Sequence, residues 1–168
     1  EVGPLARMLV RKDKTLLDLA GKLNIGPSVL ARLAARAIET KVIADAMMGW
    51  ITELKLDGPT FTAYQPHSGE GNGFADAPRG ALSHHIVIEG GRIKNYHLVV
   101  PTTWNAGPRD ANGVRGPIEE ALIGTPVKDA TQPIEVARVV RSFDPCIACA
   151  VHVVDLENPE KAANFRAF

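Results

Sequence analysis

The sequence predicts an α+β fold that is mainly helical, with long helices of a bundle followed by a β-hairpin and short helices. Two patterns lead to this expectation. From residue 4 to residue 56, apolar residues recur at spacings of three and four, which is the period of an α-helix. Between residues 84 and 105 they alternate on either side of a Gly-Gly pair, which is typical of two strands joined by a tight turn. The chain has 168 residues, 45% of them hydrophobic, and so is large enough to enclose a core.

The helical section covers residues 1–56. Its first periodic stretch, residues 4–23, predicts a helix that the sequence NIGP at residues 24–27 interrupts. Pro27 suits the first turn of a second helix, which carries a broad apolar stripe. Such a stripe predicts a helix packed inside a bundle. Its members are Leu30, Leu33, Ile38, Val42, Ile43, Ala46, Met47, Trp50 and Ile51.

Residues 57–116 form a loop and hairpin section. Gly, Pro, Ser and Asn dominate residues 57–79, which predicts a long loop, and loops of this length are usually functional or mobile. The hairpin follows, with its turn at Gly90 and Gly91. Residues 102–116 predict a second polar loop.

The last section, residues 117–152, begins with two short predicted helices at residues 117–124 and 132–143. Pro145 biases Asp144 away from helical geometry, so we expect the chain to turn there. Residues placed just after such a turn are well exposed to act as ligands.

Charge and cysteine content narrow the classes of function. Lysine plus arginine number 19, as do aspartate plus glutamate, so the charge gives no reason to expect a nucleic-acid or anionic-membrane partner. Two cysteines, three positions apart, are too few and too close for a disulfide scaffold. The pair therefore favours a chemical role.

These cysteines form the pattern Cys146-x-x-Cys149-x-x-His152. A haem attachment site is excluded, because its histidine directly follows the second cysteine. A redox dithiol, a structural zinc site completed by another histidine, and two buried core cysteines remain open on spacing alone.

Three motifs occur in order along the second half of the chain. They are GFADAPRGALSHHI at residues 73–86, GGRIKNYHLVVPTTWNAGPRD at residues 90–110 and DPCIACAVH at residues 144–152. In this order they resemble the A-P-R-G segment, the strand leading into P-T-T-W-N, and the C-terminal D-P-C-x-x-C-x-x-H motif of nickel–iron hydrogenase large subunits. The match is strong over residues 66–152, and the helical section fits the helical bundle of that family.

The resemblance implies an oxidoreductase that cleaves H2 reversibly into protons and electrons at a nickel–iron centre. Four cysteines hold this centre in the family. Cys146 matches the terminal nickel ligand, and Cys149 matches a ligand that bridges the two metals. His152 matches the ligand of a nearby magnesium ion, to which Leu98 would offer its backbone carbonyl.

In the family the iron carries CO and cyanide ligands, and the resemblance assigns residues to the pocket around them. Thr102 would donate its hydroxyl to one cyanide. Arg79 would reach the second cyanide or stand over the open metal position, where its positive charge would polarise H2. Pro78 and Pro101 would form apolar walls, and Asp144 would pair with Arg79.

The chain departs from the family pattern in two respects. The N-terminal C-x-x-C motif with the other two nickel ligands is missing, which predicts either that the rest of the site lies on another polypeptide or that residues 1–152 are the C-terminal part of a larger subunit. The N-terminal part would then complete the site. Asp76 stands where many relatives carry glutamate, which leaves a proton-relay role at this position open. Residues 153–168 resemble the extension that an endopeptidase removes during maturation.

The resemblance also implies partners: a small subunit with iron–sulfur clusters, and the maturation chaperones and endopeptidase. One alternative is an immature, metal-free precursor fragment that these maturation proteins recognise. A second alternative, a relative that has lost hydrogenase chemistry, is disfavoured because Cys146, Cys149 and His152 are present. Both a cytoplasmic location and a periplasmic or membrane-associated location, through the small subunit, remain open.

Overall fold

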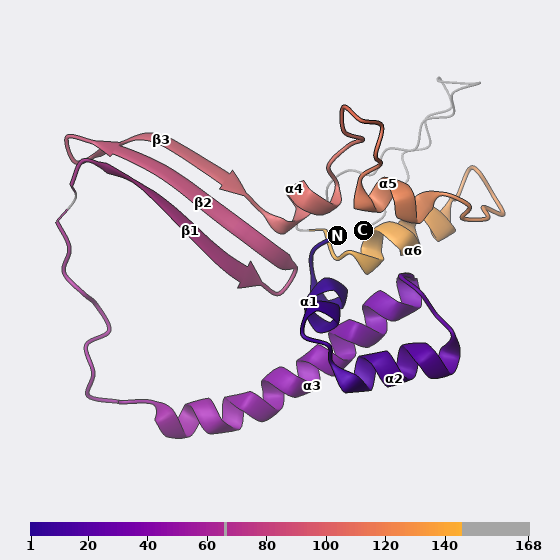
Figure 1. Ribbon diagram of the computed structural model, residues 1–168, viewed down its shortest axis with the longest axis horizontal. Coiled ribbons are helices and arrows are strands. Elements are labelled where there is room, and N and C mark those ends of the chain that lie inside the picture. Colours follow the sequence, from indigo (N-terminus) through magenta and orange to yellow (C-terminus); the bar gives the residue numbers. More distant parts are fainter. Residues whose placement is uncertain (66, 146–168) are drawn as a thin grey trace.

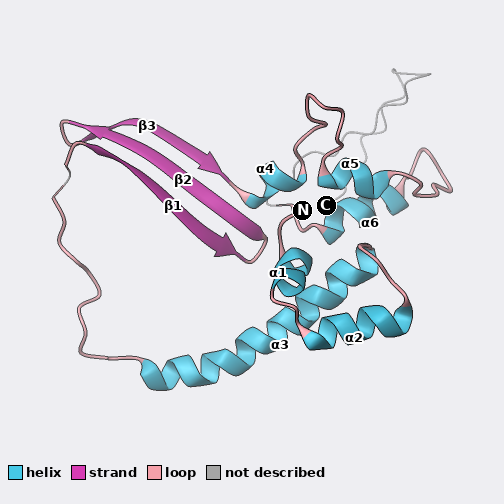
Figure 2. Cartoon of the chain, viewed as in Figure 1, coloured by secondary structure: helices cyan, strands magenta, loops and turns pink. Residues whose placement is uncertain are grey.

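The structure is a computed structural model that describes residues 1–65 and 67–145. Most of its helices gather at one end, and the antiparallel sheet and the longest helix extend away from them (Figure 1). Between the third helix and the first strand, residues 54–65 and 67–68 form no helix or strand (Figure 2). The elements are α1 (Pro4–Val10), α2 (Lys14–Leu23), α3 (Val29–Glu53), β1 (Gly69–Ala77), β2 (Gly80–Glu89), β3 (Arg92–Val99), α4 (Pro101–Asn105), α5 (Pro117–Leu122) and α6 (Ile134–Ser142).

The helix predicted over residues 4–23 is divided into α1 and α2, so the prediction of one continuous helix is wrong. Lys12 has a left-handed backbone, with φ of 56°, which ends α1. The side chain of Asp13 then accepts a hydrogen bond of 3.0 Å from the N–H of Leu16 and caps α2. The apolar period continues through this corner, so periodicity alone does not reveal it.

α3 begins at the cap Ser28, whose Oγ accepts a 3.2 Å hydrogen bond from the N–H of Ala31. Its first half packs on α1 and α2 through small residues, Ala31 and Ala35, which let the helices approach closely. The stripe predicted for this helix is therefore only partly right, since Leu30 and Leu33 are about half exposed. The core cluster consists of Leu5, Met8, Leu16, Ala31 and Ala35, with Ile25 and Ile38 against it.

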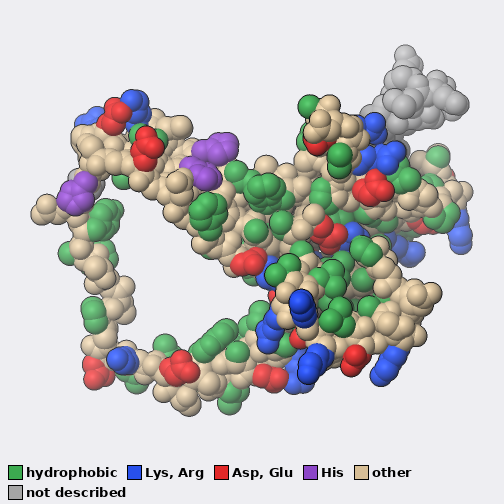
Figure 3. All heavy atoms as spheres, viewed as in Figure 1, with side chains coloured by type: hydrophobic (Ala, Val, Ile, Leu, Met, Phe, Trp, Pro, Cys, Tyr) green, Lys and Arg blue, Asp and Glu red, His purple; other side chains and the backbone are tan. Residues whose placement is uncertain are grey.

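The second half of α3 carries apolar side chains that the described part of the chain leaves largely exposed. Figure 3 shows hydrophobic side chains along this stretch, at the lower edge of the molecule. They are Ile43, Met47, Met48, Trp50 and Ile51. None of the helices in the described ranges is long and apolar enough to cross a bilayer.

The sheet has three antiparallel strands in the order β1-β2-β3, and the predicted hairpin is its second half. Gly90 and Gly91 form the β2–β3 turn with φ of 56° and 74°, as a tight turn of this kind requires. The loop predicted over residues 57–79 is wrong for residues 69–77, which form β1. Its Gly-x-Gly-x-Gly sequence lacks the apolar alternation of a strand, but β1 pairs with β2 along its whole length, ending at Ala77–Gly80.

The loop predicted over residues 102–116 is also wrong in its first part. A short helix, α4, follows β3 directly, with Pro101 at its first position. The two short helices predicted after this loop are present as α5 and α6. α6 packs against α3 and α5.

Gly80 lies where residues 1–3, the N-terminal segment, meet the β1–β2 turn. We therefore expect Gly80→Ala to destabilise the protein. Its φ is 138°, and an added Cβ would lie 2.8 Å from the backbone nitrogen of Gly3. The strain should lower the free energy of unfolding by about 1–3 kcal/mol. Urea unfolding of the subunit measures this.

The matched control is Gly21→Ala within α2, where an added Cβ would meet nothing within 4 Å. This change should raise the free energy of unfolding by about 0.5–1 kcal/mol, because alanine favours helix. Equal effects of the two substitutions would contradict the close packing at Gly80.

Candidate active site

Arg79 lies in the turn between β1 and β2, and it faces Asp144 at the end of α6. Because Ala77 pairs with Gly80, Pro78 and Arg79 form a two-residue turn. The Arg79 Nε lies 3.4 Å from Oδ2 of Asp144. Two of the three motifs therefore meet in space, and the expected pairing of Arg79 with Asp144 is present. Both side chains remain about 40% exposed, so this pair by itself adds little stability.

The backbone at Asp144 is left-handed, with φ of 50°. Its N–H donates a 2.9 Å hydrogen bond to the carbonyl of Arg141, which closes the last turn of α6. The expectation that the chain leaves helical geometry at this residue is confirmed. Asp144 thus lies where α6 ends and the segment with the two cysteines begins.

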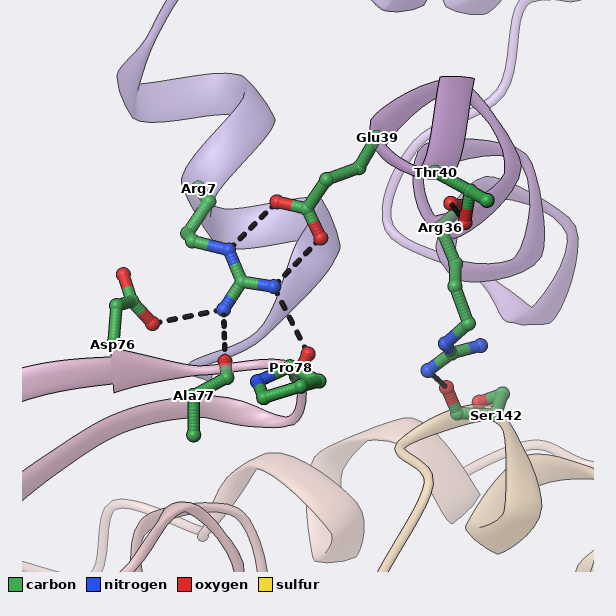
Figure 4. Close-up of polar contacts among 8 residues, drawn as sticks. All are labelled: Arg7, Arg36, Glu39, Thr40, Asp76, Ala77, Pro78 and Ser142. Carbon is green, nitrogen blue, oxygen red and sulfur yellow. Dashed lines mark hydrogen bonds and ion pairs between the residues drawn. The ribbon is translucent and has the colours of Figure 1, made fainter. Parts of the chain in front are cut away.

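Two arginines of α3 hold this end of α6. Arg36 donates a 3.0 Å hydrogen bond from Nη2 to the carbonyl of Ser142 (Figure 4). The guanidinium carbon of Arg32 lies 3.8 Å above the ring of Phe143. Cations at a helix C-terminus interact favourably with the exposed carbonyls there. Arg32 and Arg36 therefore fix the position from which Asp144 extends.

Arg7 of α1 holds the turn that carries Arg79, as Figure 4 shows. Its Nε and Nη2 bind the two oxygens of Glu39 at 2.7 and 2.6 Å. Its Nη1 binds Asp76 and the carbonyl of Ala77, each at 2.8 Å. Its Nη2 also donates to the carbonyl of Pro78 at 2.9 Å. Glu39, and then Asp76, raise the pKa of Arg7 above its usual value, against the opposing effect of burial.

Residues 1–3 contact two of the motifs and the helix α3 that supports the end of α6. The buried Asn105 side chain of α4 accepts from the N–H of Val2 and donates to its carbonyl, both at 2.9 Å. Gly3 lies against the turn, since a Cβ there would be 3.0 Å from the carbonyl oxygen of Arg79. The Glu1 carboxylate binds Arg32 at 2.9 and 2.8 Å.

The other predicted site residues of the described ranges lie in α4, in β3 and in the β1–β2 turn. Pro101 is buried and Thr102 partly buried in α4, which contacts β2. Leu98 lies in β3 opposite His84 and is 45% exposed. Pro78 is exposed in the turn beside Arg79. Cys146, Cys149 and His152 lie outside the described residues. Within the described ranges, no cluster of three or more metal-ligating side chains occurs.

A cleft of about 550 Å³ lies beside the Arg7 contacts. Charged groups line it, among them Arg7, Glu39, Asp76 and Asp144, together with Pro78 of the turn. Asp76, whose role the sequence left open, is here a second partner of Arg7 beside Glu39.

Sequence reasoning missed the residues that support the site. Arg7, Arg32 and Glu39 lie in stretches that periodicity assigns to helices, and they carry no motif signal of their own. Asn105 ends the P-T-T-W-N motif, but the motif gave it no role. Spacing offers one hint, because Arg32, Arg36 and Glu39 recur at the helical period on one side of α3.

Residues 1–152 match the family model of nickel-dependent hydrogenases. The chain belongs to this family. As a nickel-dependent hydrogenase chain, it is 45% identical to the quinone-reactive Ni/Fe-hydrogenase large chain of Wolinella succinogenes, over 95% of this chain and 31% of that protein. It is 43% identical to the periplasmic NiFeSe hydrogenase large subunit of Desulfomicrobium baculatum, over 96% of this chain and 34% of that protein.

The fold of this hydrogenase chain is also that of the family. The solved structure of a reduced, active Ni-Fe-Se hydrogenase from Desulfomicrobium baculatum matches it with a TM-score of 0.75 and 45% identity, covering 90% of this chain and 34% of that chain. The reduced Ni-Fe-Se hydrogenase of D. vulgaris Hildenborough matches with a TM-score of 0.73 and 43% identity, over 90% and 35%. The chain therefore spans about a third of the length of the relatives that it matches.

We expect Asn105→Ala to loosen the N-terminal segment, because it leaves the N–H and carbonyl of Val2 without their hydrogen-bond partner. The free energy of unfolding should fall by about 1–3 kcal/mol, as measured by urea unfolding of the subunit. Asn112→Ala is the control. Asn112 is exposed and uses its backbone N–H to bind Asp110, so its substitution should alter the free energy of unfolding by no more than about 0.5 kcal/mol. A loss as large as that of Asn105→Ala would contradict the assigned role.

Proposed function

We propose that this chain is part of the catalytic large subunit of a nickel–iron hydrogenase, which converts H2 reversibly into two protons and two electrons. The observation that carries this proposal is the meeting of Arg79 and Asp144, which come from two separate family motifs. Asp144 precedes Cys146 by two residues, so Arg79 lies beside the start of the proposed ligand segment. The family membership over residues 1–152 supports the same conclusion.

The residues around the turn fit a nickel–iron centre with CO and cyanide on iron. The Nε of Arg79 is shielded from solvent, yet it makes no hydrogen bond within the described part of the chain. Its nearest anionic group is Oδ2 of Asp144 at 3.4 Å, an ion pair without hydrogen-bond geometry. A buried donor without a hydrogen bond is costly, and a bound anionic ligand would supply one. The sequence contains cysteine rather than selenocysteine, so Cys146 and Cys149 would offer thiolates to the metals, ligands that soft transition metals favour.

In this proposal the centre supplies the redox chemistry, and the chain supplies charge, ligands and shape. Arg79 keeps a positive charge at the reacting position, where preorganised electrostatics contributes strongly to catalysis. Asp144 orients the Arg79 guanidinium from the side of α6. Thr102 would donate to a cyanide, and Pro78 and Pro101 would keep its surroundings apolar.

The remaining components are proposals of the same kind. The N-terminal part of the subunit would contribute the other two thiolates. A small subunit with iron–sulfur clusters would carry the electrons. His152 and the carbonyl of Leu98 would bind magnesium, and an endopeptidase would cut after His152, where the family match also ends.

Arg79→Lys tests the electrostatic role in the complete hydrogenase. Lysine keeps the charge but loses the planar fork, so we expect kcat for H2 oxidation to fall by about 10²–10³-fold with nickel still bound. Nickel analysis and an H2-oxidation assay measure this. Arg92→Lys, in the β2–β3 turn region, is the control and should leave kcat unchanged. A fully active Arg79→Lys enzyme would contradict the proposal.

Cys149→Ser tests the metal ligands. Because a serine hydroxyl is a poor substitute for a bridging thiolate, the purified complex should lose nickel and the infrared bands of CO and cyanide. Met48→Leu removes an exposed sulfur on α3 and should leave both unchanged. Normal nickel content and H2 oxidation in Cys149→Ser would refute the ligand assignment.

The proposed cleavage after His152 is tested by mass spectrometry of the intact subunit from active enzyme. We expect a C-terminus at His152, with residues 153–168 removed. Active enzyme that still carries these residues would contradict the cleavage.

A further inference from the structure

The guanidinium of Arg7 uses every donor that it has. Arginine carries five N–H groups in a planar fork. In this structure the five make two hydrogen bonds to Glu39, one to Asp76 and two to the carbonyls of Ala77 and Pro78. A surface arginine without specific protein partners would donate most of its hydrogen bonds to water. The Arg7 guanidinium is therefore held in one orientation, by the β1–β2 turn on one side and by α3 on the other.

One of these two sides is the turn that carries Arg79. The carbonyls of Ala77 and Pro78 are the two acceptors immediately before Arg79 along the backbone. Binding both to one rigid group fixes the two peptide planes that lead into Arg79. From the other side of the turn, Gly3 lies against the carbonyl of Arg79, so the turn is held between α1 and the N-terminal segment.

The other side is α3, and α3 also supports Asp144. Glu39, which holds Arg7, follows Arg36 by three residues on the same helix, and Arg36 binds the carbonyl of Ser142 at the end of α6. Figure 4 shows Glu39 and Arg36 extending from α3 toward these two neighbours. The separation of Arg79 from Asp144 is therefore set by one helix.

We propose that Arg7, oriented by Glu39, is a positioning residue that fixes where the Arg79 guanidinium lies relative to Asp144 and the reacting metals. The inference rests on the proposed function, because it concerns the same site. Arg7 acts through Arg79 and touches neither substrate nor metal ligand in this role.

Lysine cannot take the place of Arg7. A single ammonium carries three donors on one atom and cannot bind a carboxylate with two parallel bonds while also reaching two backbone carbonyls. Arg7→Lys, although it conserves charge, is therefore expected to behave like Arg7→Met. Arg11→Met, on an exposed arginine at the end of α1, is the matched control.

The first experiment measures H2 oxidation per bound nickel in the complete hydrogenase complex. Displacement of a catalytic group by about 1 Å can cost about 10²-fold in rate, so we expect Arg7→Met to lower kcat about 10- to 100-fold with nickel retained. In an Arg79→Lys background the same change should have little further effect, because Arg7 acts through Arg79. Arg11→Met should leave the rate per nickel unchanged in both backgrounds.

The second experiment does not depend on activity. Hydrogen–deuterium exchange of the complex should report faster exchange of the amides in residues 77–82 in Arg7→Met than in wild type, by about tenfold or more. Arg11→Met should leave the exchange of this segment as in wild type. If Arg7→Met prevents assembly, Glu39→Gln, which keeps the side-chain shape but removes the charge that orients Arg7, is measured in its place.

The outcomes separate this inference from the proposed function. A wild-type complex without nickel or H2 oxidation would overturn the proposed function, and the exchange experiment would still decide whether Arg7 holds the turn. Where the wild type is active, the inference is overturned if Arg7→Met, or Glu39→Gln in its place, keeps both the wild-type rate per nickel and the wild-type hydrogen exchange of the turn. Equal losses in the Arg79→Lys and wild-type backgrounds would also overturn it, because Arg7 would then act independently of Arg79.

Discussion

The close contact of the N-terminal segment with the β1–β2 turn is the constraint on which the site depends. Gly3 and Gly80 approach so closely that a Cβ on either residue would collide with the backbone of the other segment. From this position Val2 reaches Asn105 of α4, and Glu1 reaches Arg32 of α3. Three residues at one end of the chain thus bring the A-P-R-G turn, the P-T-T-W-N helix and the support of α6 to one place.

The contacts differ in strength, and the stronger ones hold the backbone that carries the candidate residue Arg79. The Arg79–Asp144 pair is half exposed, and its hydrogen-bond geometry is incomplete. Arg7 and Glu39 form a two-point ion pair whose side chains are only 22% and 14% exposed. Because partly buried, two-point pairs are stronger than exposed single contacts, the support is stiffer than the pair that it positions. In the proposed function, the Arg79 side chain would then respond to a ligand while its backbone stays fixed.

The sequence by itself determined the elements whose physical signal is local. The helical period of residues 4–56, the glycine turn at Gly90 and Gly91, and the short helices α5 and α6 follow from side-chain spacing and turn residues. The motifs determined the family and the candidate residues Arg79 and Asp144, because their residue types and order are specific. The departure of Asp144 from helical geometry also agrees with the steric effect of Pro145, although that effect does not specify the left-handed φ of 50°.

Only the tertiary structure decided the remainder, since its causes lie far apart along the chain. The strand β1 exists because β2 supplies its hydrogen bonds, although its glycines carry no strand signal. The break at Lys12 and Asp13 is set by a backbone conformation that the apolar period does not record. Arg7 and the turn that carries Arg79 are about seventy residues apart in the sequence, a separation that no local pattern can cover. Their contact arises when α1, α3 and the turn pack together. Motifs can name the residues of a site, but their relative positions follow from the folded chain.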